Sequence, residues 1–182
     1  MKNIISLVNS HNAFLVKNDK WQYLKNPILE LNLTSLLENN ISLKNIIVPF
    51  EQWLTVNNND TNASSAHHIR AFSIENTTDV SLVKPWLDMI SLIVLDFPHF
   101  TDGRAYSQAV EIRRHLGWQG EIRANGHVLR DQLSHMYRCG FNSFAISDDR
   151  DPVETLKGLQ GISVLYANSV TDPEPLFRRR LS

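Results

Sequence analysis

The sequence has almost no cysteine: Cys139 is the only one among 182 residues. A single cysteine cannot form an internal disulfide, and it cannot supply the paired thiolates of a structural zinc or iron–sulfur site. This cysteine usage is typical of proteins from a reducing compartment. We therefore expect a cytoplasmic protein.

Long apolar runs and an excess of charge of either sign are also missing. No run approaches the roughly 20 residues needed to cross a bilayer, and the N-terminal stretch lacks the apolar core and cleavage site of a secretion signal. The net charge is −1, and the only basic run is Arg178–Arg180. Neither a nucleic-acid partner nor a membrane partner is expected from this balance.

Familiar cofactor and metal signatures are absent as well. The sequence contains no GxGxxG, Walker, GxSxG, CxxC or HExxH pattern, so it identifies no cofactor. Asp131, His135 and Cys139 follow His127 at helical spacing, but a face of this length is too long for one ion to contact every member. We predict no metal site. A metal hydrolase that uses His127, Asp131 and His135 is the least favoured alternative.

What the sequence does contain is a regular alternation of strand-like and helix-like segments. Residues 3–17 read as a hairpin, since two apolar segments flank the turn-forming Asn9–Asn12. We also expect a short helix at Thr34–Glu38 and an exposed loop at Asn57–Ser65. Further along the chain, strands are predicted at 46–48, 69–74, 90–95, 121–124, 143–146 and 162–166, and helices at 80–88, 105–116, 128–139 and 151–157.

This alternation predicts an α/β protein of mostly parallel (βα) units. The chain is shorter than the roughly 250 residues of a complete eight-fold barrel. We therefore expect an open or partial-barrel sheet with an N-terminal β-hairpin, all within one domain over residues 1–182. Residues 90–147, which read as a βαβαβ unit, form its central part.

Three polar turns follow predicted strands, at Asp96–Arg104, Arg123–His127 and Ser147–Arg150. Ligands of parallel sheets gather at the C-terminal ends of the strands. Glycines before a helix permit positive φ or close backbone approach, and helix N-termini favour anions. We therefore predict a site for a small anion. Its residues include Asp96, Asp102, Gly103, Arg104, Arg123, Gly126 and Arg130.

The same charges have a purely structural interpretation, which carries equal weight. Carboxylate pairs with Arg104 or Arg130 can lock two neighbouring loops together, and Asp102 can serve only as a helix cap. Arg123 differs, because its strand neighbours Ile122 and Ala124 point to the other face of the sheet. Its inward side chain needs a partner, either a carboxylate or a ligand.

The stretch DFPHFTDGRAYSQAVEIRRHLGWQGEIRANGHVLRDQLSHMYRCGFNSF closely resembles a bacterial family of unknown function whose members are described as oxidoreductases of sulfite reduction. Weaker similarity at VPFEQW and YANSVTDPEPLFRRR extends the resemblance over most of the chain. The positions that match the family pattern are Phe97, Pro98, Phe100, Asp102, Gly103, Arg104, Tyr106, Ser107, Arg123, Ala124, Gly126, Asp131, Gln132, Arg138, Cys139 and Gly140.

The resemblance implies an oxidoreductase or accessory protein of assimilatory sulfite reduction and cysteine biosynthesis, with a sulfite- or sulfate-pathway reductase as its partner. It adds Tyr106, Ser107 and Gln132 to the ligand-binding residues. A non-catalytic scaffold that docks onto such a reductase is the alternative. The cofactor stays unknown.

The catalytic residue also stays unknown; the candidates are Asp102, His127 and Asp131. Three positions depart from the family pattern. Ala105 replaces a glycine, Asn125 replaces an aliphatic residue, and His127 replaces an aspartate. If that aspartate acts as an acid–base group in the family, the activity of this chain is altered.

Overall fold

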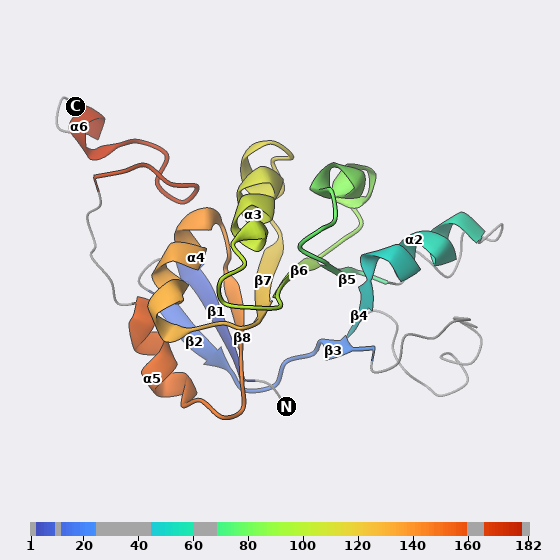
Figure 1. Cartoon of the computed structure of the whole chain (residues 1–182), viewed down its shortest axis with the longest axis horizontal. Coiled ribbons are helices and arrows are strands. Elements are labelled where there is room, and N and C mark those ends of the chain that lie inside the picture. The colour runs from blue at the N-terminus through green and yellow to red at the C-terminus, as the bar shows by residue number, and fades with distance from the viewer. Residues whose placement is uncertain (1–2, 10–11, 25–44, 60–68, 160–165, 180–182) are drawn as a thin grey trace.

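The computed structural model describes residues 3–9, 12–24, 45–59, 69–159 and 166–179 (Figure 1). The strands are β1 (Asn3–Asn9), β2 (Asn12–Val16), β3 (Gln22–Tyr23), β4 (Ile46–Pro49), β5 (Ala71–Ile74), β6 (Leu92–Phe97), β7 (Glu121–Gly126) and β8 (Ser143–Ile146). The α-helices are α2 (Phe50–Asn59), α3 (Arg104–Arg114), α4 (Leu133–Cys139), α5 (Pro152–Leu156) and α6 (Leu176–Arg179). The 3-10 helices are η3 (Val80–Trp86), η4 (Arg130–Gln132) and η5 (Lys157–Leu159).

Within the described residues, the strands form one eight-stranded sheet in the order β2-β1-β8-β7-β6-β5-β4-β3. Strands β3 to β8 are parallel to one another, and β1 is antiparallel to both β2 and β8. The sheet curls into an open half-barrel. The predicted α/β class, the mostly parallel units and the N-terminal hairpin are therefore confirmed.

The curl follows from one short connection. Strands β2 and β3 are consecutive in sequence but lie at opposite edges of the sheet, and only the residues between Val16 and Gln22 join them. That segment reaches about 20 Å when fully extended. Eight flat strands would place the edges about 34 Å apart. The two edges must therefore approach each other across one face.

The two faces of the sheet carry different side chains. Helices α3 and α4 cover one face (Figure 1), where Ile122 and Ala124 of β7 join a large core that includes Ala109 and Met136. The opposite face carries a smaller apolar cluster, which contains Trp21, Ile47, Ala71, Leu92 and Val94. The division follows from strand geometry, because successive side chains point to opposite faces.

Arg113 secures the end of α4 against α3. Its Nε donates to the carbonyl of Gly140 at 2.9 Å and its NH1 donates to that of Trp118 at 2.8 Å. Burial lowers its pKa to about 10. Gly140 has a φ of 112°, so it ends the helix in the left-handed conformation expected of a C-terminal glycine.

Some predicted elements differ from the structure. The helix expected over residues 128–139 is divided into η4 and α4, and the one expected over 80–88 is the 3-10 helix η3, which contains Pro85. Residues 57–59, predicted to begin an exposed loop, instead end the unpredicted helix α2. The helix expected at 34–38 and residues 162–165 of the last expected strand lie outside the described residues.

Within the described part of the chain, no helix has both the length and the apolar character that a membrane span requires. The longest α-helix described is α3, with 11 residues.

Gly126 should be intolerant of a side chain. Its φ is 92°, and an added Cβ would lie 2.3 Å from the carbonyl oxygen of Phe97, which also accepts a hydrogen bond from the backbone N–H of His127. We expect Gly126→Ala to lower the free energy of unfolding by about 1–3 kcal/mol in urea denaturation.

Gly103→Ala is the matched control. Gly103 has a φ of −88°, and a Cβ there would meet only Tyr106, at 3.7 Å. This variant should unfold at nearly the same urea concentration as the wild type. Equal destabilisation by the two substitutions would contradict this explanation.

Candidate functional site

Asp102 is the centre of the polar loop between β6 and α3. Its carboxylate accepts hydrogen bonds from the Nδ2 of Asn76 at 2.6 Å, from the backbone N–H of Arg104 at 3.2 Å, and from the Nε and NH2 of Arg104 at 3.0 and 2.6 Å. Asn76 follows β5, so this contact joins the loops after two adjacent strands. Asp102 therefore connects the loops that follow β5 and β6, and it also binds the side chain of Arg104.

The ion pair determines the protonation state of Asp102. The hydrogen bonds from Arg104 lower the pKa of the Asp102 carboxyl to about 2, and the same contact raises the pKa of Arg104. A general acid works best when its pKa lies near the working pH. Asp102 is thus an ionised partner of Arg104 at neutral pH and is poorly suited to donate a proton there.

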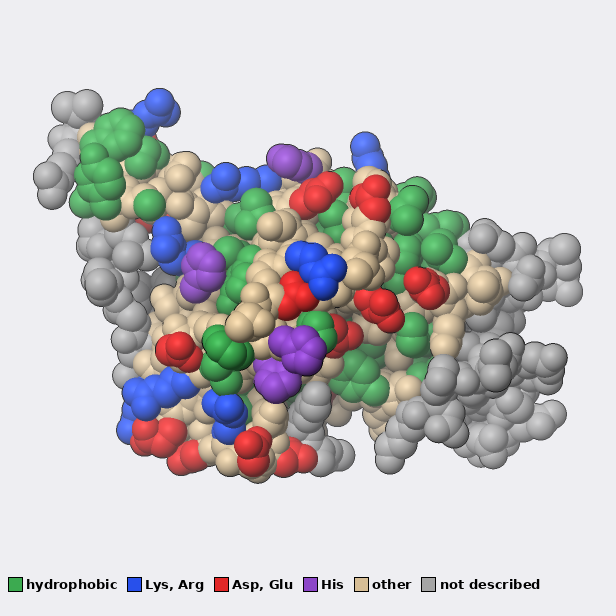
Figure 2. Space-filling model, in the orientation of Figure 1, with side chains coloured by type: hydrophobic (Ala, Val, Ile, Leu, Met, Phe, Trp, Pro, Cys, Tyr) green, Lys and Arg blue, Asp and Glu red, His purple; other side chains and the backbone are tan. Residues whose placement is uncertain are grey.

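Two histidines lie next to each other where β6 and β7 end. The rings of His99 and His127 are 6.1 Å apart, and both residues are exposed. Figure 2 shows histidine side chains together near the centre of this face, with acidic and basic side chains beside them. His127 stands at a departure from the family pattern, and here it faces solvent and a second imidazole.

Arg123 lies on the opposite face of the sheet from α3. Its side chain is only 3% exposed and pairs with Asp19 at 2.6 Å and with Glu121 at 2.8 Å. Its Nε also contacts the hydroxyl of Ser143 at 3.2 Å. Burial alone would lower the pKa of Arg123, but the bonds to Asp19 and Glu121 outweigh it and the pKa is raised. The expected carboxylate partner therefore exists, and Arg123 does not converge with Arg104.

Asp96 also lies outside the loop that holds Arg104. It is opposite Asn125 in the β6–β7 ladder and accepts a hydrogen bond from the Asn125 amide. An aliphatic residue at position 125 could not donate this bond. Burial, followed by the negative charge of Asp96, raises the pKa of Tyr23, which places this tyrosine near the same polar residues.

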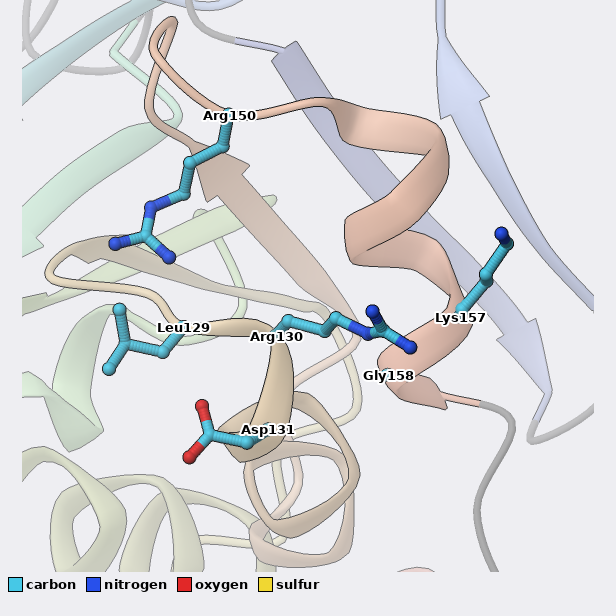
Figure 3. A pocket seen from close by; sticks show the side chains of 6 residues that line it. All are labelled: Leu129, Arg130, Asp131, Arg150, Lys157 and Gly158. Atoms are coloured by element: carbon cyan, nitrogen blue, oxygen red, sulfur yellow. The ribbon is translucent and has the colours of Figure 1, made fainter.

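A pocket of about 660 Å³ opens where β7 and β8 end. Its lining contains three cations and one acid: Arg130, Arg150, Lys157 and Asp131, together with Leu129 and Gly158 (Figure 3). Arg130 and Asp131 come from η4, Arg150 follows β8, and Lys157 begins η5. The pocket therefore joins segments that are far apart in sequence and carries a net positive charge.

Close backbone packing forms one wall of this pocket. A Cβ added to Gly158 would lie 2.0 Å from the carbonyl oxygen of Arg130 and 2.9 Å from its Cγ. Only glycine permits this approach of η5 to η4. Glu154 pairs with Lys157 and lies 3.6 Å from Arg130, so one carboxylate accompanies two of the three cations.

The other predicted site residues are dispersed. Tyr106 is half-buried and packs against Phe97 and His135, with ring centroids 5.1 and 4.8 Å away. Ser107 is exposed, and the Oε1 of Gln132 is buried without a hydrogen-bond partner among the described residues. The predicted set therefore divides into the Asp102 loop, the Arg123 network and the pocket.

The thiol of Cys139 lies 3.8 Å from the Nε2 of His135. Burial raises the pKa of this thiol. Among the residues that the structure describes, no group of three or more His, Cys, Asp or Glu side chains could hold a metal ion. His135 and Cys139 thus form a local contact between neighbouring turns of α4.

Several residues of these sites were not predicted. Asp19 had no signal of its own, because it lies 104 positions from Arg123. Glu121 had one that was missed, since it lies two residues before Arg123 in the same strand and therefore on the same face. Lys157 was expected only as the end of a helix. Arg150 belonged to the third polar turn, and its place after a strand was the signal that could have included it.

The fold and the charged loops together define a class of protein. It is an α/β protein with a curled, mostly parallel sheet and with polar loops at the C-terminal ends of the strands. Residues 71–177 match the family model described as "Bacterial protein of unknown function (DUF934)". This match covers more than half of the chain, so the protein belongs to that family. The description of the family does not mention sulfite reduction. No curated protein matches the chain significantly.

Arg123 and Arg104 should respond differently to substitution. Arg123→Met would leave Asp19 and Glu121 without their shared cation on a mostly buried face, and breaking a buried pair in this way costs about 3 kcal/mol. Arg104→Met removes a pair whose arginine side chain is 56% exposed, and should lower the urea midpoint much less. Similar midpoints for both variants would contradict the assignment of Arg123 as a structural residue.

The Asp102 carboxyl should titrate near pH 2 when followed by carboxyl carbon NMR. Since its pKa is lowered by folding, the pair with Arg104 stabilises the protein above the ordinary value of about 3.9 and loses that effect as the pH falls toward 2. Arg104→Ala should return the midpoint toward the ordinary value.

Asp79 is the internal control for this titration. Its pKa is lowered by hydrogen bonds from Ser81 and not by an arginine. Its midpoint should stay the same in Arg104→Ala. An unchanged Asp102 midpoint in that variant would show that Arg104 is not the cause.

Proposed function

We propose that this protein is a cytoplasmic accessory protein of assimilatory sulfite reduction and that it binds a small oxyanion in the pocket at the ends of β7 and β8. The pathway rests on the resemblance of the stretch from Asp96 to Phe144. The anion rests on one observation, the excess of cations in the lining of that pocket. A partner reductase supplies the redox cofactor.

The lining cations favour this pocket over an anion site that contains both Arg104 and Arg123, as the sequence predicts. Arg104 is paired with Asp102, and Arg123 is paired with two carboxylates on the opposite face. Arg150, in contrast, makes no ion pair with any residue that the structure describes, and it is exposed. A guanidinium of this kind can bind an oxyanion with two parallel hydrogen bonds.

The second candidate is a non-catalytic scaffold that docks onto a reductase of sulfur assimilation. It is favoured by an exposed aromatic pair near the C-terminal end: Tyr166 is 70% exposed, Phe177 is 49% exposed, and their rings are 6.3 Å apart. Arg178 lies over the ring of Phe177 at 6.0 Å. Exposed aromatics beside arginine are typical of residues that dominate protein interfaces.

Sulfate and sulfite should raise the melting temperature of the wild-type protein relative to sodium chloride of equal ionic strength. At ten times the dissociation constant, ligand binding adds about 1.4 kcal/mol, or roughly 3–6 °C for a protein of this size. Arg150→Gln should remove most of this increase. The reason is that Arg150 is the lining cation that forms no ion pair with any residue the structure describes.

Arg70→Gln is the matched control. It removes the same charge from an exposed position just before β5, at the opposite ends of the strands, and should leave the increase intact. No increase with either anion would contradict the anion site. If the protein then also co-elutes with a purified sulfite reductase, the scaffold becomes the better explanation.

A further inference from the structure

Glu154 occupies an unusual position beside the pocket. It lies in the first turn of α5, and its carboxylate pairs with Lys157 and lies 3.6 Å from the NH1 of Arg130. All three side chains are about half exposed, at 51%, 49% and 55% for Glu154, Lys157 and Arg130. The pairs are therefore weak and can be replaced by others.

The direction of Arg130 agrees with these pairs. In Figure 3 its guanidinium extends toward α5, whereas the guanidinium of Arg150 lies near Leu129, on the side away from α5. The stem of Arg130 passes Gly158, where a Cβ would come within 2.9 Å of its Cγ. Arg130 thus lies beside Glu154, and its guanidinium is apart from that of Arg150 (Figure 3).

Like charges explain why a carboxylate is needed for this arrangement. Arg130 and Arg150 repel each other, and Glu154 offers Arg130 an alternative partner. An oxyanion held between the two guanidiniums would replace that partner and offset the repulsion. Without Glu154, the three lining cations and Asp131 leave two positive charges, which one doubly charged anion neutralises.

We propose that Glu154 is a competing carboxylate that sets the affinity of this pocket: a dianionic oxyanion of the sulfate or phosphate type displaces it, and Arg130 and Arg150 then bind the anion together. This inference rests on the proposed anion site and adds its ligand class and its specificity-determining residue. Glu154 is not a ligand. It acts by pairing with Arg130 and Lys157 before the anion binds.

The test is a titration of the isotope-labelled full chain with sodium sulfate at constant ionic strength, followed by NMR of the arginine Nε–H signals. Glu154→Gln should bind sulfate about two- to fivefold more tightly than the wild type, the range expected for loss of one exposed ion pair. The wild type should bind sulfate more tightly than the monoanion nitrate.

Glu51→Gln is the matched control, because Glu51 is also an exposed acid in the first turn of a helix, α2, whose residues do not line the pocket. It should leave the sulfate affinity unchanged. Both variants lose one negative charge. A comparison of their sulfate affinities therefore distinguishes a specific role of Glu154 from a general effect of net charge. An equal gain in Glu51→Gln would overturn the proposal.

The remaining outcomes separate this inference from the proposed function. If the wild type binds sulfate and Glu154→Gln binds it equally or less tightly, Glu154 is not a competitor, while the anion site stands. Equal affinity of the wild type for sulfate and nitrate overturns the dianion class. If neither the wild type nor Glu154→Gln binds sulfate, the anion site itself is wrong and this inference fails with it.

Discussion

The rest of the structure depends on a charge buried in the middle of the sheet. Arg123 points to the face that carries none of the described helices, where an unpaired guanidinium would cost several kcal/mol. Asp19 supplies one of its partners from the segment that crosses between the two edges of the sheet. The pair therefore fixes the crossing segment at its midpoint, keeps the sheet curled, and leaves the opposite face to the helices and the core. The cations of the proposed ligand pocket lie elsewhere, in the segments that follow the ends of β7 and β8.

Much of this fold could be predicted from the sequence because its signals are local. Strand and helix periods, and the Asp151-Pro152 start of α5, depend on neighbouring residues, and Asp151 does accept a hydrogen bond from the backbone N–H of Val153. The attachment of the hairpin to β8 has no local signal, since Ile4 pairs with Ala145. Helix α2 was missed because its last turn is rich in asparagine, which is typical of loops.

The candidate site was predictable to a smaller extent. The charged residues of the loops could be found because they follow predicted strands. The need of Arg123 for a partner follows from strand alternation, which turns its side chain to one face of the sheet. The choice of Asp19 as a partner does not follow from the sequence, because only the fold brings this distant carboxylate near Arg123. Gly103 and Gly126 show the same limit: both precede helices in sequence, yet only Gly126 adopts positive φ and touches the neighbouring strand.

The pairing of β1 with β8 has a consequence for biosynthesis. During translation β1 leaves the ribosome early, but its partner strand is made only after most of the sheet has been synthesised. Until then the apolar residues of the hairpin stay exposed on the nascent chain, and closing so long a loop slows folding. We infer that the parallel strands assemble first and that the hairpin joins last.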